Sequence, residues 1–323
     1  MPANLTPDYE RAELRYRQAG SDEERIEALR EMLSLLPKHK GTDKMQADLK
    51  RRISQLRKSQ ARKPARSVDL FHVPKGGCGQ VVLTGPPNSG KSLLLATTTN
   101  APVKVADYPF TTALPAPGMW QYQDVQIQVV DTPPLTEEHV VPGLMGAIRF
   151  ADVLALVVDA RNGLEQADST LRALTHRGLQ LRSAPRDQLD DDPNQYPALI
   201  VAAKADLAAP GDLTALAELY AGTLDVLDVS CTTGQGLDAL QQRLWELLAV
   251  VRVYTKEPGR PADHDKPFTL PAGSTVEDLA REIHRELPEK MKYARIWGHG
   301  RFDGQQVHRT EPLCDRDVVE IHQ

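Results

Sequence analysis

One eight-residue stretch decides the fold of this chain: Gly85-Pro86-Pro87-Asn88-Ser89-Gly90-Lys91-Ser92. It fits the pattern G-x-x-x-x-G-K-[ST] of phosphate-binding loops (P-loops). A phosphate chain is held best by a ring of backbone N–H groups, and the ring needs residues without a bulky Cβ where the backbone turns inward. Gly85 and Gly90 meet this need. The pattern places Lys91 on nucleotide phosphates and the Ser92 hydroxyl on Mg²⁺.

The residues around this loop have the pattern that a P-loop requires. Residues 80–84 predict a short buried strand, and residues 93–96 continue as a helix whose positive dipole end faces the phosphates. Further along, apolar strands are expected at residues 125–130, 153–158, 198–203 and 226–229, and helices at residues 168–178, 212–221 and 236–249. This alternation predicts an α/β fold, with a mostly parallel sheet and helices on both faces.

Composition narrows the class of protein. The 323 residues are 41% hydrophobic and 26% charged, with a formal net charge of −5, which is ordinary for a globular protein of two or three domains. The three cysteines, Cys78, Cys231 and Cys314, lack the spacing of a metal site or a disulfide framework. No signal segment and no run of 18 apolar residues is evident. We therefore expect a cytoplasmic protein with no membrane association.

Charge and pattern divide the chain into three parts. An N-terminal helical basic region, residues 1–66, has 16 Lys/Arg and 10 Asp/Glu. The P-loop domain, residues 67–250, has 11 and 21, and a C-terminal domain, residues 251–323, has 12 and 13. In the C-terminal domain, short strands surround one helix that Ser274 or Thr275 caps, which predicts a compact α+β module.

The N-terminal region is expected to form a helical hairpin. A capping box at residues 21–24 starts its first helix, Pro37 ends it, and Thr42 is a plausible cap for the second helix. Residues 9–17 are also expected to be helical. Residues 38–66 hold 11 Lys/Arg and 2 acids, which favours contact with RNA phosphates. The alternatives are a solvated basic face, or docking of this helix onto the acidic P-loop domain.

Four further stretches follow the P-loop in an informative order. Each stands where a nucleotide-binding domain needs a switch, a metal ligand or a base-reading group. They are Tyr108-Pro109-Phe110-Thr111-Thr112, Asp131-Thr132-Pro133, Lys204-Ala205-Asp206 and Ser230-Cys231.

With these residues in hand, the chain resembles the Obg-type GTPases, and most closely their developmentally regulated GTP-binding protein branch. The P-loop with Asn88 and the threonine pair of residues 111–112 carry much of this likeness. The C-terminal part resembles a TGS domain, a ubiquitin-like β-grasp module. Its cues are Val-Tyr-Thr-Lys at 253–256, Leu-Pro at 270–271, Thr-Val-Glu-Asp-Leu at 275–279 and Tyr-Ala-Arg-Ile-Trp-Gly at 293–298.

The resemblance implies a slow Mg²⁺-dependent GTPase that binds GTP and GDP and associates with ribosomes or RNA, through residues 38–66 and the TGS domain. It implies that the P-loop residues bind phosphate, and that Ser92, Asp131 and either Thr111 or Thr112 hold Mg²⁺. It implies that Lys204 and Asp206 bind the guanine base, and that backbone N–H groups of Ser230 and Cys231 meet the guanine carbonyl. An asparagine like Asn88 goes with a K⁺ ion near the phosphates in related proteins, which implies K⁺ stimulation.

Three departures from the family pattern qualify this expectation. Ala203 replaces an asparagine that braces the P-loop and contacts the base. Pro134, in switch II, replaces a glycine whose N–H meets the γ-phosphate, and proline has no N–H. A short stretch over residues 135–150 replaces the glycine-rich remainder of switch II. Two alternatives therefore stay open: a nucleotide-binding adaptor with little or no hydrolysis, which Pro134 favours, and an ATP-using relative, which Ala203 favours.

Overall fold

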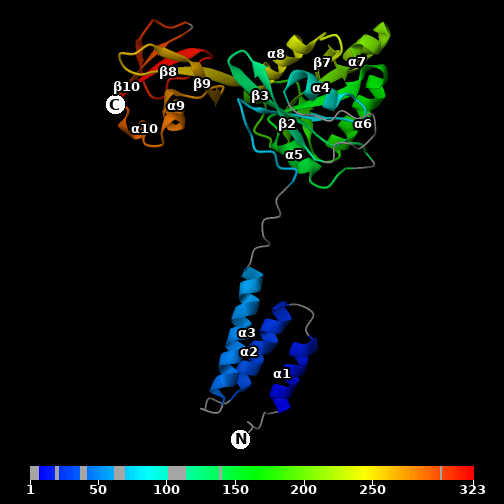
Figure 1. The fold of residues 1–323 in the computed structure, drawn as a ribbon, viewed down its shortest axis with the longest axis vertical. Helices are drawn as coiled ribbons and strands as arrows, with labels where there is room; N and C mark the ends of the chain where they lie inside the picture. Colours follow the sequence, from blue (N-terminus) through cyan, green and yellow to red (C-terminus); the bar gives the residue numbers. More distant parts are fainter. Residues whose placement is uncertain are drawn as a thin grey trace. The chain divides into compact units, whose positions relative to one another are not determined.

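The computed structural model describes residues 7–18, 22–36, 42–61, 70–100, 114–137, 140–298 and 300–323. The chain divides into two compact units, Met1–Asp69 and Leu70–Gln323 (Figure 1). Within the described ranges, no helix is both long enough and apolar enough to cross a membrane.

The first unit contains three helices: α1 (Pro7–Gln18), α2 (Asp22–Leu35) and α3 (Asp43–Ala61). The two helices of the expected hairpin are α2 and α3, and α1 adds a third. Their shared apolar side chains form one buried cluster: Tyr9, Ala12, Ile26, Leu29, Met32, Leu36, Leu49 and Ile53. Helix α3 begins directly after Thr42, at the expected cap position, whereas the expected capping box begins at Ser21, outside the described residues.

The second unit is built on a seven-stranded sheet in the order β2-β3-β1-β4-β6-β5, with β7 also paired to β6. Its strands are β1 (Gln80–Thr84), β2 (Ala116–Tyr122), β3 (Val125–Asp131), β4 (Val153–Asp159), β5 (Gln180–Arg182), β6 (Gln195–Ala203) and β7 (Val226–Val229). All neighbouring strands are parallel except β2 and β3. Parallel strands covered on both faces are apolar throughout, and β4 is buried at every position. The predicted sheet is confirmed.

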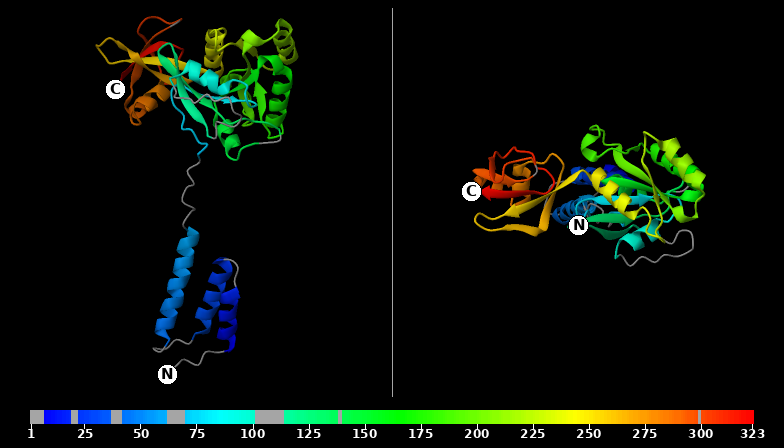
Figure 2. Two further views of the ribbon diagram at one scale, coloured as in Figure 1. Left: turned by 45° about the vertical axis from the view of Figure 1, so that its right-hand side comes forward. Right: turned by 90° about the horizontal axis from the view of Figure 1, so that it is seen from above.

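Helices cover both faces of this sheet (Figures 1 and 2). Apolar side chains of α5 (Leu144–Phe150), α6 (Gly163–Thr175) and α7 (Pro210–Tyr220) join one buried cluster. Those of α4 (Lys91–Thr98) and α8 (Leu237–Leu248) join the cluster on the other face. The loops that leave the carboxyl ends of the strands are thereby held at one edge, where open α/β sheets bind their ligands.

The C-terminal module has its own five-stranded sheet in the order β11-β10-β12-β8-β9. Its elements are β8 (Val250–Lys256), β9 (Ala262–Pro271), α9 (Val276–Ile283), α10 (Leu287–Lys290), β10 (Tyr293–Trp297), β11 (Gln305–Val307) and β12 (Asp317–His322). Thr275 caps α9 through a reciprocal hydrogen bond with Asp278. Helix α9 packs on one face of the sheet around the module's own buried cluster, which confirms the predicted β-grasp module.

Candidate nucleotide-binding site

The P-loop connects β1 to α4, and two of its glycines have geometric reasons to be glycine. Gly85 has φ 148°, and a Cβ there would lie 2.2 Å from the carbonyl oxygen of Val157. Gly90 has φ 107°, and a Cβ there would lie 3.3 Å from the Cβ of Ala203. Any other L residue would be strained at both positions. The loop therefore has the backbone shape that leaves N–H groups available to a phosphate.

The Lys91 side chain lies inside this loop and is only 6% exposed. Its ammonium donates to the carbonyl oxygens of Gly85 at 3.0 Å and Pro86 at 2.7 Å, and to the hydroxyl of Ser89 at 3.3 Å. Burial lowers the pKa of Lys91 to about 8, against the opposing charge of Asp131. A buried cation with a depressed pKa is stabilised by an incoming anion, which suits Lys91 to a phosphate.

The two expected Mg²⁺ ligands of the described chain meet directly. The hydroxyl of Ser92, at the start of α4, donates to Oδ2 of Asp131 at 2.6 Å. Asp131 ends β3 and is fully buried. Hard oxygen donors of this kind, a hydroxyl and a carboxylate, are what Mg²⁺ prefers. The donor set fits a magnesium ion, and the threonines expected to complete it, Thr111 and Thr112, lie outside the described residues.

The start of switch II is joined to the P-loop by its backbone. The N–H of Leu135, the residue after Pro134, donates to the carbonyl oxygen of Gly85 at 3.0 Å. The Leu135 side chain is fully buried in the core cluster of the α5–α7 face. The hydroxyl of Thr132 donates to the carbonyl oxygen of Leu83 at 2.7 Å. Thus the first N–H after Pro134 is turned toward the protein backbone.

Lys204 links two sides of the site. It has φ 60°, and its ammonium donates to the backbone oxygen of Asn88 at 2.6 Å and to Oδ2 of Asp159 at 2.8 Å. Asn88 is itself exposed and has φ 59°. Lys204 thus connects the P-loop to the end of β4. Its neighbour Ala203, which stands in place of the family's asparagine, has no side-chain donor or acceptor.

The expected base-reading residues lie at the ends of neighbouring strands. Asp206 is exposed in the 3₁₀ turn Ala205–Leu207 after β6, and Ser230 and Cys231 follow β7. Burial raises the pKa of the Cys231 thiol, and the nearby charge of Asp206 raises it further. The fully buried Ser230 hydroxyl accepts from the N–H of Thr233 at 3.2 Å and shapes this turn. The turns after β6 and β7 therefore carry the expected base-reading residues at the ends of two paired strands.

Asp159 is a residue of this site that the sequence analysis did not identify. It ends β4, and its Oδ1 and Oδ2 accept from Nε and Nη2 of Arg161 at 3.0 and 2.7 Å. The guanidinium of Arg161, and then the ammonium of Lys204, hold the pKa of the Asp159 carboxyl well below its usual range. The available signal was an aspartate at the end of a buried apolar strand, the same pattern that identified Asp131.

Two family models match this chain. The model described as "50S ribosome-binding GTPase" matches residues 80–184, and the model described as "TGS domain" matches residues 251–323. The first covers the P-loop, Asp131 and Asp159. The second covers the C-terminal module.

Relatives match over nearly the whole chain. An uncharacterized GTP-binding protein of Halobacterium salinarum is 26% identical, and the match covers 93% of this chain and 98% of the relative. Developmentally-regulated G-protein 2 of Arabidopsis thaliana is 28% identical, with 92% and 90% covered. Developmentally-regulated GTP-binding protein 2 of Homo sapiens is 26% identical, with 92% and 98% covered.

The family resemblance drawn from the motifs is confirmed by these matches, in which both domains occur in the expected order. The chain thus combines a GTPase domain with a C-terminal TGS domain, and it is related over most of its length to the developmentally regulated GTP-binding proteins.

Proposed function

We propose that this chain binds GTP and GDP with Mg²⁺, hydrolyses GTP slowly, and associates with RNA or the ribosome in the cytoplasm. The observation that carries the nucleotide proposal is the buried Lys91 ammonium within a glycine-shaped loop, beside the contact between Ser92 and Asp131. In this proposal the loop N–H groups and Lys91 bind the phosphates. Lys204 and Asp206 hold the base, together with the backbone after β7. Titration with labelled GTP in Mg²⁺ buffer tests the proposal directly.

Magnesium would be held by the Ser92 hydroxyl and by Asp131, with Thr111 or Thr112 as the expected third group. When bound, it neutralises charge that develops on the phosphates during transfer. The protein's own part is positioning. Asp131 is held by β3, and Ser92 by the first turn of α4, so both oxygens are fixed before the nucleotide arrives.

Nucleotide affinity is expected to fall above about pH 8. Bound phosphate favours the charged form of Lys91 and so raises its pKa. Lys91 must therefore carry its proton when the nucleotide binds. The pKa of Lys91 in the free protein is about 8. Affinity for GDP should therefore be flat at lower pH and fall about tenfold per unit above pH 8. Fluorescence titration from pH 7 to 9 measures this dependence.

Lys91→Arg is the matched control, because a guanidinium keeps its proton throughout this pH range. Its affinity should be lower than that of the unchanged protein but nearly independent of pH. Titration of the guanine base affects both proteins equally and cancels in the comparison. If both proteins lose affinity in parallel above pH 8, deprotonation of Lys91 is not the cause.

Hydrolysis is expected to be slow in Na⁺ and faster in K⁺. The residue after Pro134 is Leu135, so no glutamine follows the Asp131 motif to orient the attacking water. Asn88 is exposed on the phosphate-binding loop, where a monovalent cation could supply the charge that an arginine finger supplies elsewhere. Such a charge is worth about 10³–10⁵ in rate. Single-turnover GTP hydrolysis in matched K⁺ and Na⁺ buffers measures the effect, and equal rates would contradict it.

A non-hydrolysing adaptor is the alternative function that the contacts of Leu135 favour. Its N–H is bonded to Gly85 and its side chain is buried, so neither Pro134 nor Leu135 offers an N–H to a γ-phosphate. In this alternative, GDP and GTP bind with similar affinity, and single turnover shows no product in either buffer. Measurable K⁺-dependent product would exclude the adaptor.

The proposed RNA contact lies in the first unit. Among the described side chains of α3, Lys50, Arg51 and Arg52 are exposed, and only Arg52 has a local ion pair, with Asp48 at 2.9 Å. These cations lie within the strongly basic residues 38–66. The TGS domain is the proposed second docking surface. Phosphate contacts of this kind are independent of sequence and sensitive to salt.

Deletion of residues 1–66 is expected to weaken co-sedimentation with ribosomes or RNA and to flatten its salt dependence. The slope of log K against log salt changes by about 0.7 for each lost contact to a single strand. Arg51→Glu should act in the same direction. Arg11→Glu is the matched control, because Arg11 is an exposed arginine of α1 that pairs with Asp8. Unchanged binding and slope in the deletion would instead favour docking of this helix onto the acidic GTPase domain.

A further inference from the structure

One hairpin of the GTPase domain extends from the nucleotide site to the TGS module. Its strands are β2 and β3, and its two-residue tip is Gln123 and Asp124. Strand β3 pairs with β2 on one side and with β1 on the other. Its seven residues span about 23 Å. One end is Asp131 in the nucleotide site, and the other end is the tip.

Arg252, on strand β8 of the TGS module, holds this tip. Its side chain is only 3% exposed. Its Nη1 donates to Oε1 of Gln123 at 2.6 Å and to Oδ1 of Asp124 at 2.8 Å. Its Nε and Nη2 donate to the two carboxylate oxygens of Asp315 at 3.0 and 2.6 Å. One guanidinium is thus bonded to both domains at once.

Three further contacts surround this arginine. The hydroxyl of Tyr254 donates to Oδ2 of Asp124, and Nη2 of Arg316 donates to Oε1 of Gln123 at 2.6 Å. The Arg252 guanidinium lies over the ring of Trp245 in α8, 4.8 Å from its centroid. Gln123 has φ 50°, so the tip is tightly turned where the TGS side chains hold it. We call these contacts of Arg252, Tyr254 and Arg316 with the tip the clamp.

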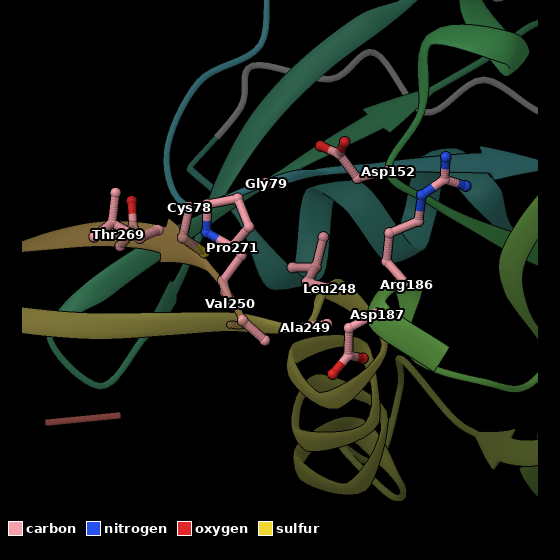
Figure 3. A pocket seen from close by; sticks show the side chains of 12 residues that line it. Cys78, Gly79, Asp152, Arg186, Asp187, Leu248, Ala249, Val250, Thr269 and Pro271 are labelled. Atoms are coloured by element: carbon pink, nitrogen blue, oxygen red, sulfur yellow. The ribbon is translucent and has the colours of Figure 1, made fainter. Parts of the chain in front are cut away.

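The junction of the two domains also contains a short chain crossing and a pocket. The chain crosses from α8 to β8 through one residue, Ala249, which has φ 49°. Beside this crossing is a pocket of about 290 Å³, lined from the GTPase side by Cys78 and Asp152 and from the TGS side by Leu270 and Pro271 (Figure 3). The buried cores of the two domains form separate clusters. The clamp is therefore the main polar connection that fixes the TGS module on the hairpin.

We propose that Arg252 is a positioning residue that couples the nucleotide site to the TGS module through the β2–β3 hairpin. Nucleotide bound at Asp131 and Ser92 restricts one end of a paired, rod-like element. The clamp restricts the other end. Each restraint reduces the ordering that the other must impose, so each strengthens the other. The proposal goes beyond nucleotide binding itself, because it adds a response of the TGS module to the nucleotide. Without the clamp, the TGS module would be attached to the GTPase domain only at Ala249 and would not respond to the nucleotide.

Reciprocity gives the proposal two independent readouts. If nucleotide tightens the clamp, then the clamp raises nucleotide affinity by the same factor. Coupling between sites is typically about 5- to 150-fold. A buried arginine with three acceptor side chains is suited to this role, because breaking one partner leaves a buried charge incompletely satisfied.

Hydrogen exchange of the full chain, with and without a non-hydrolysable GTP analogue, tests the coupling. In the unchanged protein, the analogue should slow exchange in β8 and β12 at least about fivefold. In Arg252→Ala this slowing should disappear while the P-loop amides stay protected by nucleotide. Gln123→Gly, which suits the positive φ, and Tyr254→Phe remove single clamp contacts and carry the test if Arg252→Ala does not fold. Nucleotide affinity should fall most in Arg252→Ala and less in Gln123→Gly and Tyr254→Phe.

Arg243→Ala is the matched control. Arg243 in α8 is also a partly buried arginine bonded to two carboxylates, Asp225 and Glu246, but it does not contact the hairpin. It should lower stability without removing the nucleotide effect on β8 and β12. A purely structural Arg252 would speed exchange equally with and without nucleotide, which overturns the proposal. Unprotected TGS strands beside protected P-loop amides also overturn it, whereas unprotected P-loop amides mean that nucleotide binding itself has failed.

Discussion

Replacing Lys91 by alanine is expected to weaken binding of GTP and GDP at least about a hundredfold. Lys91 is the only side-chain cation of the P-loop, and its ammonium is already inside the loop. A hydrogen bond to a charged group is worth about 1.5–3 kcal/mol, and a lysine that reaches two phosphates makes more than one. The loss therefore corresponds to at least two factors of ten in affinity. Equilibrium titration with fluorescent GDP and a GTP analogue measures it.

Lys75→Ala is the matched control for this experiment. Lys75 is a more exposed lysine of the same domain, paired with Asp152 at the opposite edge of the sheet. Its loss should leave nucleotide affinity unchanged. Thermal denaturation without nucleotide checks that both variants are folded. Unchanged affinity in Lys91→Ala would contradict the P-loop assignment.

The second large effect is expected at the base. Asp206→Asn should lower GTP affinity about tenfold to a hundredfold and raise affinity for xanthosine triphosphate. A carboxylate presents two acceptors to the two N–H donors of guanine, whereas an amide presents one acceptor and one donor. Xanthine has a carbonyl where guanine has its amino group, so the amide matches it. Competition between the two nucleotides measures the change of preference.

Asp190→Asn is the control for base choice, because Asp190 is in a surface loop and bonds only Gln195 in the described chain. It should bind both nucleotides as the unchanged protein does. A preference for guanine that survives Asp206→Asn would place base reading elsewhere, with the backbone after β7 as the remaining candidate.

Local patterns predicted most of the P-loop domain. The spacing of Gly85, Gly90 and Lys91 is dictated by the phosphate-binding shape itself, so the motif alone identified it. The run of residues 153–158 was apolar on both faces, which is typical of a parallel strand covered on both sides. The seven helical and strand segments expected after residue 120 all correspond to elements of the structure.

Strand β2 was not predicted, and its residues explain why. It contains Pro117 and Gly118, which normally argue against a strand. Within the described sheet β2 pairs only with β3 and is an edge strand, where proline is tolerated. Gly118 is required by packing, because a Cβ there would lie 2.4 Å from the hydroxyl of Thr99. The reason for both residues lies in tertiary contacts that no local pattern records.

The clamp and the contacts of Asp159 were also outside the reach of the sequence. Arg252 and Asp124 are separated by 128 positions, and no spacing rule joins them. The same holds for Leu135, whose N–H meets Gly85 50 positions earlier. Sequence showed that Pro134 lacks a donor. Only the fold showed where the next donor points.

Competition between GTP and ATP for the unchanged protein in Mg²⁺ buffer tests the central claim most directly. Asp206 in the turn after β6, together with a phosphate loop braced by Lys204, predicts a guanine site even though Ala203 replaces the usual asparagine. A missing neutral hydrogen bond costs only about 0.5–1.5 kcal/mol. Asp206 should therefore still determine the preference for guanine over adenine. We expect GTP to displace labelled GDP at concentrations at least tenfold lower than ATP requires. Equal displacement by ATP would contradict the account.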